Sequence, residues 1–322
     1  MVEMKEIQIT DIKGIKVGHA QNAEAATGCT VILCEKGAPC GVDVRGSAPA
    51  TRETDAIRPG NVCQMAHGVM LSGGSAFGLE AAQGAMEYLE KKGIGFDVGV
   101  TKVPIISGAS LFDLQVGSHE IRPDKEMGKM ACENAFKELP EEGNVGAGMG
   151  ATIGKLLGPD RMMKSGLGIY AVQVGMLQVG AVVAVNALGD VFDMDTGVQI
   201  GGLLSKDKKG LIQTEKLLIE QYEEMGNLFS DNTTIGCIVT NTILDNTMAG
   251  KIASMAHDGM ARAIRPIHTL ADGDAIFTLA TGEVAASPNA VGTLAAYVMG
   301  KAINRGVKKA KDAYGLLCAA NL

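Results

Sequence analysis

Short apolar runs and amphipathic helical stretches alternate along almost the whole chain, and this alternation restricts the fold more than any other feature. The apolar runs are bounded by turn residues and predict strands at 29–34, 40–44, 68–72, 167–175, 178–186, 234–240 and 275–281. Stretches of helical character predict helices at 76–92, 123–138, 248–264 and 288–310. Strands interleaved with helices predict a layered α/β or α+β domain.

A segment dense in charge, residues 203–232, interrupts this pattern. It has no strand-like run, and we expect a solvated loop that contains a surface helix. Because core-forming elements resume beyond it, the segment is interpreted as an internal loop. We therefore expect one domain that covers residues 1–322.

The charge and cysteine content exclude several classes of protein. A formal net charge of −7 and a pI of about 5.3 argue against a nucleic-acid binder. The N-terminal sequence MVEMKEIQIT has no basic region followed by an apolar one, and no run of ~18 apolar residues occurs. We thus expect no secretory signal and no membrane partner. The seven cysteines form no C-x-x-C pair, which predicts reduced thiols in a cytoplasmic protein.

The common metal, nucleotide and serine-nucleophile motifs are all incomplete. The five histidines lack metal-ligand spacing, so we expect surface or capping histidines and no cofactor: His19, His67, His119, His257 and His268. The glycine-rich loop 144–158 satisfies neither the dinucleotide fingerprint nor the P-loop pattern. Ser75 lies in LSGGSAFG, which departs from G-x-S-x-G at Phe77. Ser75 is therefore predicted to be a helix N-cap, at a turn whose N–H groups can bind an anion or a carbonyl.

The junction between Asn232 and Thr233 allows two interpretations. Spacing alone favours an Asx turn that enters the strand at 234–240. The alternative is self-cleavage, in which the Thr233 hydroxyl attacks the Asn232 carbonyl and water then releases a new N-terminus at Thr233. The freed α-amine, with an ordinary pKa of about 7.7–8.0, could then act as the base for the hydroxyl of its own residue.

Seven sequence segments, spread over almost the whole chain, are similar to those of a known family, and this similarity favours the self-cleavage interpretation. They are IKVGHA (15–20), GVDVRGSAPATRETD (41–55), LSGGSAFGLEAA (71–82), GNVGAGMGATIGK (143–155), GAVVAVNALGDV (180–191), NTTIG (232–236) and MAHDGMARAIRPIHT (255–269). Together they make the chain resemble the DmpA/BapA-like family of self-processing aminopeptidases and amidohydrolases. That family includes L-aminopeptidase/D-esterases, β-peptidyl aminopeptidases and pantetheine-amide hydrolases.

The resemblance implies a four-layer αββα sandwich of the kind shared with ornithine acetyltransferases. It implies cleavage between Asn232 and Thr233 into chains 1–232 and 233–322, with Thr233 as the nucleophile. Asn186 matches the oxyanion-hole asparagine of the family. Asp272 and Asp274 align with a Ser-x-Glu pair that lies near the free amine in peptidase members, although an ordinary Asp-Gly turn would have the same sequence.

Other consequences of the resemblance concern the surroundings of the site. Gly148, Gly150, Lys155 and Ser75 are candidates for a substrate-binding or oxyanion loop. The expected substrate is a small-molecule amide or a short peptide. The expected assembly is a homo-oligomer, a tetramer of large-plus-small chain units.

Two departures from the peptidase members bear on specificity. Gly108 stands where those members carry a glutamate for the substrate amine, and Gly154-Lys155 stand near the position of a tyrosine. Both leave the nucleophile chemistry in place. The resemblance favours a hydrolase; the alternatives are an acyltransferase of the ornithine acetyltransferase type and an inactive binding relative.

Overall fold

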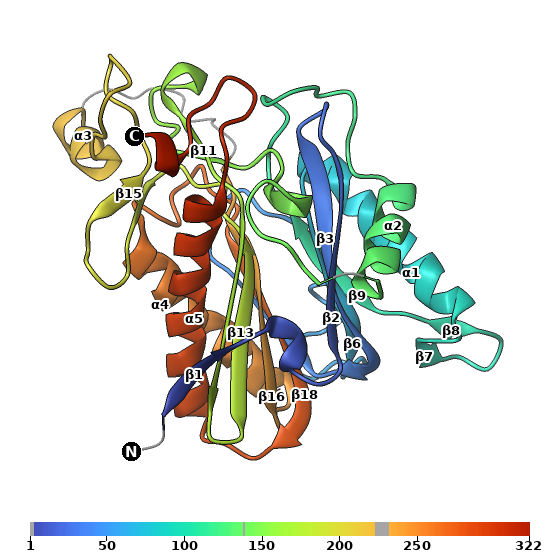
Figure 1. The fold of residues 1–322 in the computed structure, drawn as a ribbon. Helices are drawn as coiled ribbons and strands as arrows, with labels where there is room; N and C mark the ends of the chain where they lie inside the picture. Colours follow the sequence, from blue (N-terminus) through green and yellow to red (C-terminus); the bar gives the residue numbers. More distant parts are fainter. Residues whose placement is uncertain (1–2, 138, 223–231) are drawn as a thin grey trace.

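Four layers of secondary structure stack in the order helix, sheet, sheet, helix (Figure 1). The computed structural model describes residues 3–137, 139–222 and 232–322. One sheet has the strand order β2 (Ile15–Asn22), β3 (Thr27–Ala38), β6 (Ala66–Ser72), β9 (Ile106–Ser110) and β5 (Ala50–Arg52). The other has the order β1 (Met4–Ile7), β12 (Leu167–Val174), β13 (Leu177–Ala184), β16 (Ile235–Thr242), β18 (Ala275–Val284) and β4 (Cys40–Val44).

Two pairs of helices cover the outer faces of the sheets (Figure 1). Helices α1 (Ala81–Lys91) and α2 (Lys125–Ala135) pack on the five-stranded sheet, and α4 (Asn246–Ala263) and α5 (Pro288–Lys309) pack on the six-stranded sheet. The side chains of Asp124 and Asp245 cap α2 and α4 by accepting the N–H groups of Met127 and Met248, at 2.9 and 2.7 Å. The described helices do not include one with the length and apolar character needed to cross a membrane.

Burial on both faces explains why the predicted strands are apolar runs. In β13, Val179, Ala181 and Val183 pack toward the helices, while Val182 and Ala184 pack toward the other sheet. The side-chain period of two therefore places apolar residues in two different cores. The interior of the sandwich thus explains the runs from which the layered fold was predicted.

The shorter elements connect the layers and edges. They are α3 (Thr214–Glu220), β7 (Phe96–Asp97), β8 (Lys102–Val103), β10 (Thr152–Ile153), β11 (Met163–Lys164), β14 (Asp190–Phe192), β15 (Gln199–Gly201), β17 (Ile264–Arg265) and the 3₁₀ turns at Ile9–Asp11, Ser75–Glu80, Gly146–Gly148, Pro159–Arg161 and Ala319–Asn321. Helix α3 confirms the surface helix expected within 203–232. Residues 223–231 of that segment, with Asp231, lie outside the described residues.

The prediction that Ser75 caps a helix is wrong. Gly74 occupies the cap position, and Ser75 is the first residue of a 3₁₀ turn that precedes α1, with φ of 56°. The N–H of Gly74 donates to Asp113 Oδ1 at 2.7 Å, and the N–H of Ser75 donates to the Leu111 carbonyl at 2.9 Å. These acceptors satisfy both N–H groups, so the turn does not use the hydroxyl.

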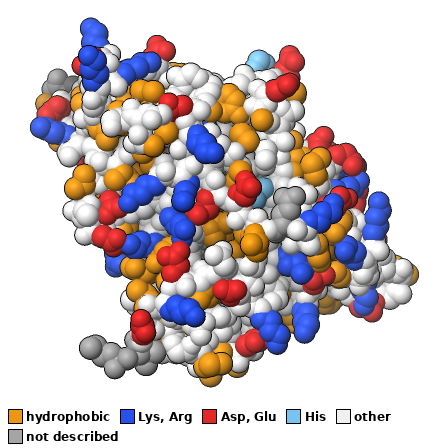
Figure 2. Space-filling view, in the orientation of Figure 1, with side chains coloured by type: hydrophobic (Ala, Val, Ile, Leu, Met, Phe, Trp, Pro, Cys, Tyr) orange, Lys and Arg blue, Asp and Glu red, His pale blue; other side chains and the backbone are white. Residues whose placement is uncertain are grey.

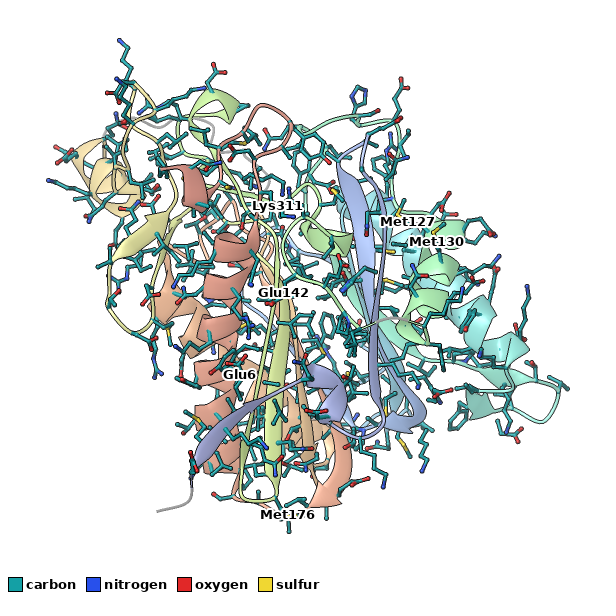
Figure 3. All side chains as sticks on the ribbon, in the orientation of Figure 1. Glu6, Met127, Met130, Glu142, Met176 and Lys311 are labelled. Atoms are coloured by element: carbon teal, nitrogen blue, oxygen red, sulfur yellow. The ribbon has the colours of Figure 1, made fainter. Side chains whose placement is uncertain are left out.

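Charged side chains of both signs are interspersed on the face shown in Figure 2. Some of them link the first strand and the segment before β12 to α5, where Arg305 pairs with Glu6 at 2.6 Å and with Glu142 at 3.2 Å. Figure 3 labels the two glutamates. All seven cysteines lie within the described residues as free thiols, and six of them are buried.

Candidate active site

Strand register brings the predicted site residues together at one edge of the six-stranded sheet. Strands β16 and β18 run parallel with Ile235 opposite Ala275, so the residues that precede each strand lie side by side. Strand β13 runs antiparallel to β16 with Ala184 opposite Ile235, so the segment after β13 reaches the same edge. Thr233, Asp274 and Asn186 therefore meet although the sequence separates them widely.

The peptide bond between Asn232 and Thr233 is buried and held by hydrogen bonds. The Thr233 N–H donates to the Asn186 carbonyl at 2.8 Å, and the Asn232 N–H donates to the Ala271 carbonyl at 3.1 Å. The Asn232 carbonyl oxygen accepts the Gly273 N–H at 2.9 Å and also the Thr233 hydroxyl. The hydroxyl and a polarising N–H thus meet at the same carbonyl group.

Two buried aspartates flank Gly273 and differ in their surroundings. Asp274 accepts the Thr234 N–H on Oδ1 at 2.7 Å, and on Oδ2 it accepts the His268 N–H at 3.2 Å and the His268 ring Nδ1 at 2.8 Å. Asp272 accepts the N–H and hydroxyl of Thr269 on Oδ2, at 2.8 and 2.6 Å. Burial and the nearby Asp274 charge raise the pKa of Asp272 to about 6.

The buried side chain of Asn186 forms hydrogen bonds with three different residues. Its side-chain amide donates to the Phe112 carbonyl at 2.9 Å, and its Oδ1 accepts the Thr152 N–H at 3.0 Å and the Lys155 ammonium at 2.7 Å. An asparagine amide carries two N–H hydrogens, so a second donor remains beside the Phe112 bond. These acceptor contacts fix which side-chain atom is the donor. Lys155 joins the site through Asn186.

The other predicted loop residues are placed by packing. A Cβ at Gly148 would lie 2.1 Å from the Leu167 nitrogen, and one at Gly150 would lie 2.1 Å from the Ala26 oxygen. Both positions therefore require glycine for close approach of backbone. Ser75 lies beside Leu111, one residue before Phe112.

A buried lysine supports the glycine loop. Lys164 Nζ donates to the carbonyls of Gly148, Ala151 and Ser165, at 3.0, 3.1 and 2.5 Å. Burial lowers the pKa of Lys164 to about 7. Sequence reasoning missed this residue because a lone lysine usually indicates a surface position.

The segment that follows β4 wraps the turn between the two aspartates. The N–H groups of Arg45 and Ala48 donate to the carbonyls of Asp274 and Asp272, both at 3.0 Å. A Cβ at Gly46 would lie 2.2 Å from the Asp274 nitrogen. The motif GVDVRGSAPATRETD therefore contributes a backbone clamp for the Asp-Gly-Asp turn.

Two histidines depart from the prediction of surface or capping positions. His257 is fully buried, and His67 is also buried. His268 is half-buried and contacts Asp274 directly. The spacing of the histidines does not predict this contact, because the partner of His268 is a carboxylate six residues away across a turn.

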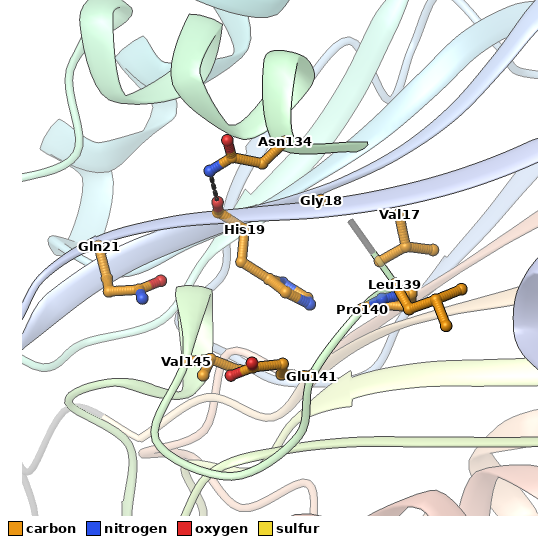
Figure 4. A pocket seen from close by; sticks show the side chains of 9 residues that line it. All are labelled: Val17, Gly18, His19, Gln21, Asn134, Leu139, Pro140, Glu141 and Val145. Carbon is orange, nitrogen blue, oxygen red and sulfur yellow. Dashed lines mark hydrogen bonds between the residues drawn. The ribbon is translucent and has the colours of Figure 1, made fainter. Parts of the chain in front are cut away.

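A separate hollow of about 220 Å³ lies elsewhere in the molecule (Figure 4). His19, Gln21, Asn134 and Glu141 supply its polar lining, which does not include Thr233 or the residues around it. Within residues 3–137, 139–222 and 232–322, no three His, Cys, Asp or Glu side chains are grouped to hold a metal ion.

Comparison with known proteins identifies the family. The model of peptidase family S58 matches residues 8–317. The chain belongs to peptidase family S58. This membership confirms the resemblance inferred from the sequence motifs and makes the chain a hydrolase of the peptidase class.

Individual S58 relatives cover most of the chain. An uncharacterized aminopeptidase of Mycobacterium tuberculosis is 38% identical over 96% of this chain and 95% of its own length. A 6-aminohexanoate-oligomer endohydrolase of Kocuria is 31% identical over 85% of this chain and 75% of its own. The L-aminopeptidase D-Ala-esterase/amidase of Ochrobactrum anthropi, a variant of the Ntn hydrolase fold, superposes with a TM-score of 0.68 at 17% identity, over 94% of this chain and 86% of that one. This likeness confirms the predicted fold.

Proposed function

We propose that this S58 member activates itself by cleaving its Asn232–Thr233 bond and then hydrolyses a small amide or a short peptide through Thr233. The observation that carries the proposal is the Asn232 carbonyl, which accepts both the Thr233 hydroxyl and the Gly273 N–H. Two buried carboxylates, Asp272 and Asp274, adjoin Gly273 on either side.

In the self-cleavage step, Thr233 Oγ attacks the Asn232 carbonyl carbon while a neighbouring carboxylate takes the hydroxyl proton. The Gly273 N–H donates to the developing oxyanion, an arrangement that stabilises tetrahedral intermediates. The C–N bond then breaks, the nitrogen gains the proton, and an ester joins Asn232 to Thr233 Oγ. Water hydrolyses this ester and leaves a carboxyl group on Asn232 and a free amine and hydroxyl on Thr233.

In turnover, the freed Thr233 amine serves as base for its own hydroxyl. The Asn186 carbonyl already accepts the Thr233 N–H and would hold the amine in the same place. The hydroxyl attacks the substrate amide, the amine product leaves with the proton, and water resolves the acyl-enzyme. The second amide hydrogen of Asn186 is the proposed oxyanion donor.

The names of the relatives and the backbone packing around Gly108 support the proposed substrate class. The relatives act, by their names, as aminopeptidases or on 6-aminohexanoate oligomers, and both activities break amide bonds. A Cβ at Gly108 in β9 would lie 2.5 Å from the Met70 carbonyl oxygen, so the backbone excludes a carboxylate side chain there. This supports a small amide or short peptide whose acyl part need not carry a free amine.

Intact mass spectrometry of the purified protein under denaturing conditions tests the proposal. We expect two species of about 24 and about 9 kDa, in proportion to the lengths of residues 1–232 and 233–322. The N-terminal residue of the small species should be Thr233. A sample that stays at 33.4 kDa after long incubation would contradict self-processing.

The rate of self-cleavage should rise with pH through about 6 and then level off. Before cleavage the Thr233 nitrogen belongs to a peptide bond, so no α-amine titrates. We assign the proton-accepting carboxylate to Asp272, which pairs with Asn232 in a β-bridge and whose raised pKa is about 6. Above that pH the carboxyl is ionised and accepts the proton; below it the carboxyl is protonated and the step slows. Precursor from a short cell-free translation, shifted to buffers of roughly pH 4.5–8.5, provides the measurement.

Asp113 offers a matched control, because burial also raises its pKa to about 6. Asp272→Asn should abolish the rise of the self-cleavage rate between acidic and neutral pH, together with most of the rate. Asp113→Asn should leave this rise at the same pH. If the rise of the rate with pH disappears in Asp113→Asn and remains in Asp272→Asn, Asp272 is not the base.

A further inference from the structure

His268 holds the carboxylate of Asp274 by two of its own donors. Its main-chain N–H and its ring Nδ1 both reach Oδ2 of Asp274, at 3.2 and 2.8 Å. The other carboxylate oxygen accepts the Thr234 N–H at 2.7 Å. Because that N–H belongs to the peptide unit directly after Thr233, the carboxylate links His268 to the backbone of the proposed nucleophile.

The backbone of His268 has an uncommon conformation for a residue with a side chain. Its φ is 58°, in the left-handed region, where Asn, Asp and His are enriched among residues other than glycine. With this backbone, the N–H and the ring of the same residue meet one oxygen atom. The side chain is 16% exposed, while the side chain of Asp274 is fully buried.

A second histidine backs the ring of His268. The two ring centroids of His257 and His268 lie 4.7 Å apart at an interplanar angle of 72°. His257 Nε2 lies 3.0 Å from the Asp43 carbonyl oxygen, which can only accept, so Nε2 carries the hydrogen. Burial lowers the pKa of His257 to about 4, which keeps this ring neutral near neutral pH.

The contacts of the two histidines form a closed ring of interactions around Asp274. Asp43 lies in β4 opposite Ile276 of β18, two residues after Asp274. Successive contacts therefore connect Asp274 to His268, His268 to His257, and His257 to Asp43. The pairing of β4 with β18 connects Asp43 to the strand that begins just after Asp274. A carboxylate inside such a ring of interactions has little freedom to turn.

We infer that His268 is a positioning residue of the candidate active site, which keeps Oδ2 of Asp274 in place so that Oδ1 stays on the Thr234 N–H and the Thr233 hydroxyl stays at its target carbonyl. The inference deepens the proposed function and rests on it. His268 takes part in no bond-making step; it acts through Asp274.

The test follows self-cleavage, which needs no substrate, in precursors from cell-free translation. His268→Gly suits the left-handed backbone and removes the ring together with Cβ, and its cleavage should be about 10- to 100-fold slower, the range of one lost hydrogen bond to a charged group. Added imidazole should restore part of the rate. His268→Asn keeps an N–H donor near the position of Nδ1 and should stay within about 3-fold of wild type.

The controls separate positioning from packing. Imidazole should not accelerate wild type or Asp274→Asn, since the first already has the donor and the second lacks the carboxylate. A wild-type rate in His268→Gly would overturn the inference, and so would a His268→Asn rate as low as that of His268→Gly without imidazole rescue. If Thr233→Ala is still cut, or wild type is not, the proposed function fails and the inference with it.

Discussion

Replacing Thr233 by alanine is expected to leave the chain uncut at 33.4 kDa and without hydrolytic activity. The change removes the Thr233 hydroxyl, which contacts the Asn232 carbonyl, while it keeps the N–H bond to the Asn186 carbonyl. Loss of the covalent nucleophile lowers kcat by about 10⁶ in a serine hydrolase that forms an acyl-enzyme. Denaturing mass spectrometry and a screen of aminoacyl anilides, β-peptides and pantetheine-type amides measure the two losses.

Two replacements at the same position sharpen this prediction. Thr233→Ser keeps a hydroxyl and should retain part of both reactions. Thr233→Cys should still cut the chain but hydrolyse amides poorly, because the tetrahedral intermediate expels thiolate more readily than an amine. Turnover at the wild-type rate in Thr233→Ala would show that another group is the nucleophile.

The pattern of apolar runs predicted a layered fold because the core strands are buried on both faces, whereas the four-layer sandwich was implied by the family resemblance. Strands such as β13 and β16 therefore stand out as apolar runs, and their bounds in the structure lie within about two residues of the predicted ones. The positions of Thr233, Asn186 and Asp274 came from motifs rather than from spacing. Their meeting at one sheet edge depends on strand order, which no local pattern encodes.

The residues that escaped prediction act through contacts that are local to turns. His268 reaches Asp274 only because its backbone is left-handed, and Gly46 is required only because the Asp-Gly-Asp turn packs 2.2 Å from where its Cβ would be. Lys164 lies buried where three carbonyls converge, and neither hydropathy nor period signals such a site. The sequence around Ser75 is typical of a helix cap, but the carboxylate of Asp113 accepts the N–H of Gly74, the residue at the cap position.

Asn186→Ala should separate turnover from self-cleavage. The side-chain amide is the proposed oxyanion donor in turnover, and loss of one such donor lowers kcat by about 10²–10³. KM should change less, because the donor binds the tetrahedral state better than the substrate. Self-cleavage should be affected far less, since its oxyanion forms on Asn232, beside the Gly273 N–H, and the contact between Asn186 and Thr233 is made by a main-chain carbonyl that alanine keeps.

The side chain of Asn186 also holds Lys155 and the Thr152 N–H, so the variant needs a control for folding. Asn186→Asp keeps the size and the acceptor for both groups but removes the donor and adds a negative charge. It should be less stable than wild type by about 1–3 kcal/mol, because the Phe112 carbonyl loses its donor, and it should lose at least as much kcat as alanine, because a carboxylate repels the oxyanion. Rates would be normalised to the fraction of free Thr233 N-termini, counted by mass spectrometry. An aspartate variant with wild-type kcat, or an alanine variant that only raises KM, would move Asn186 from oxyanion stabilisation to ground-state binding.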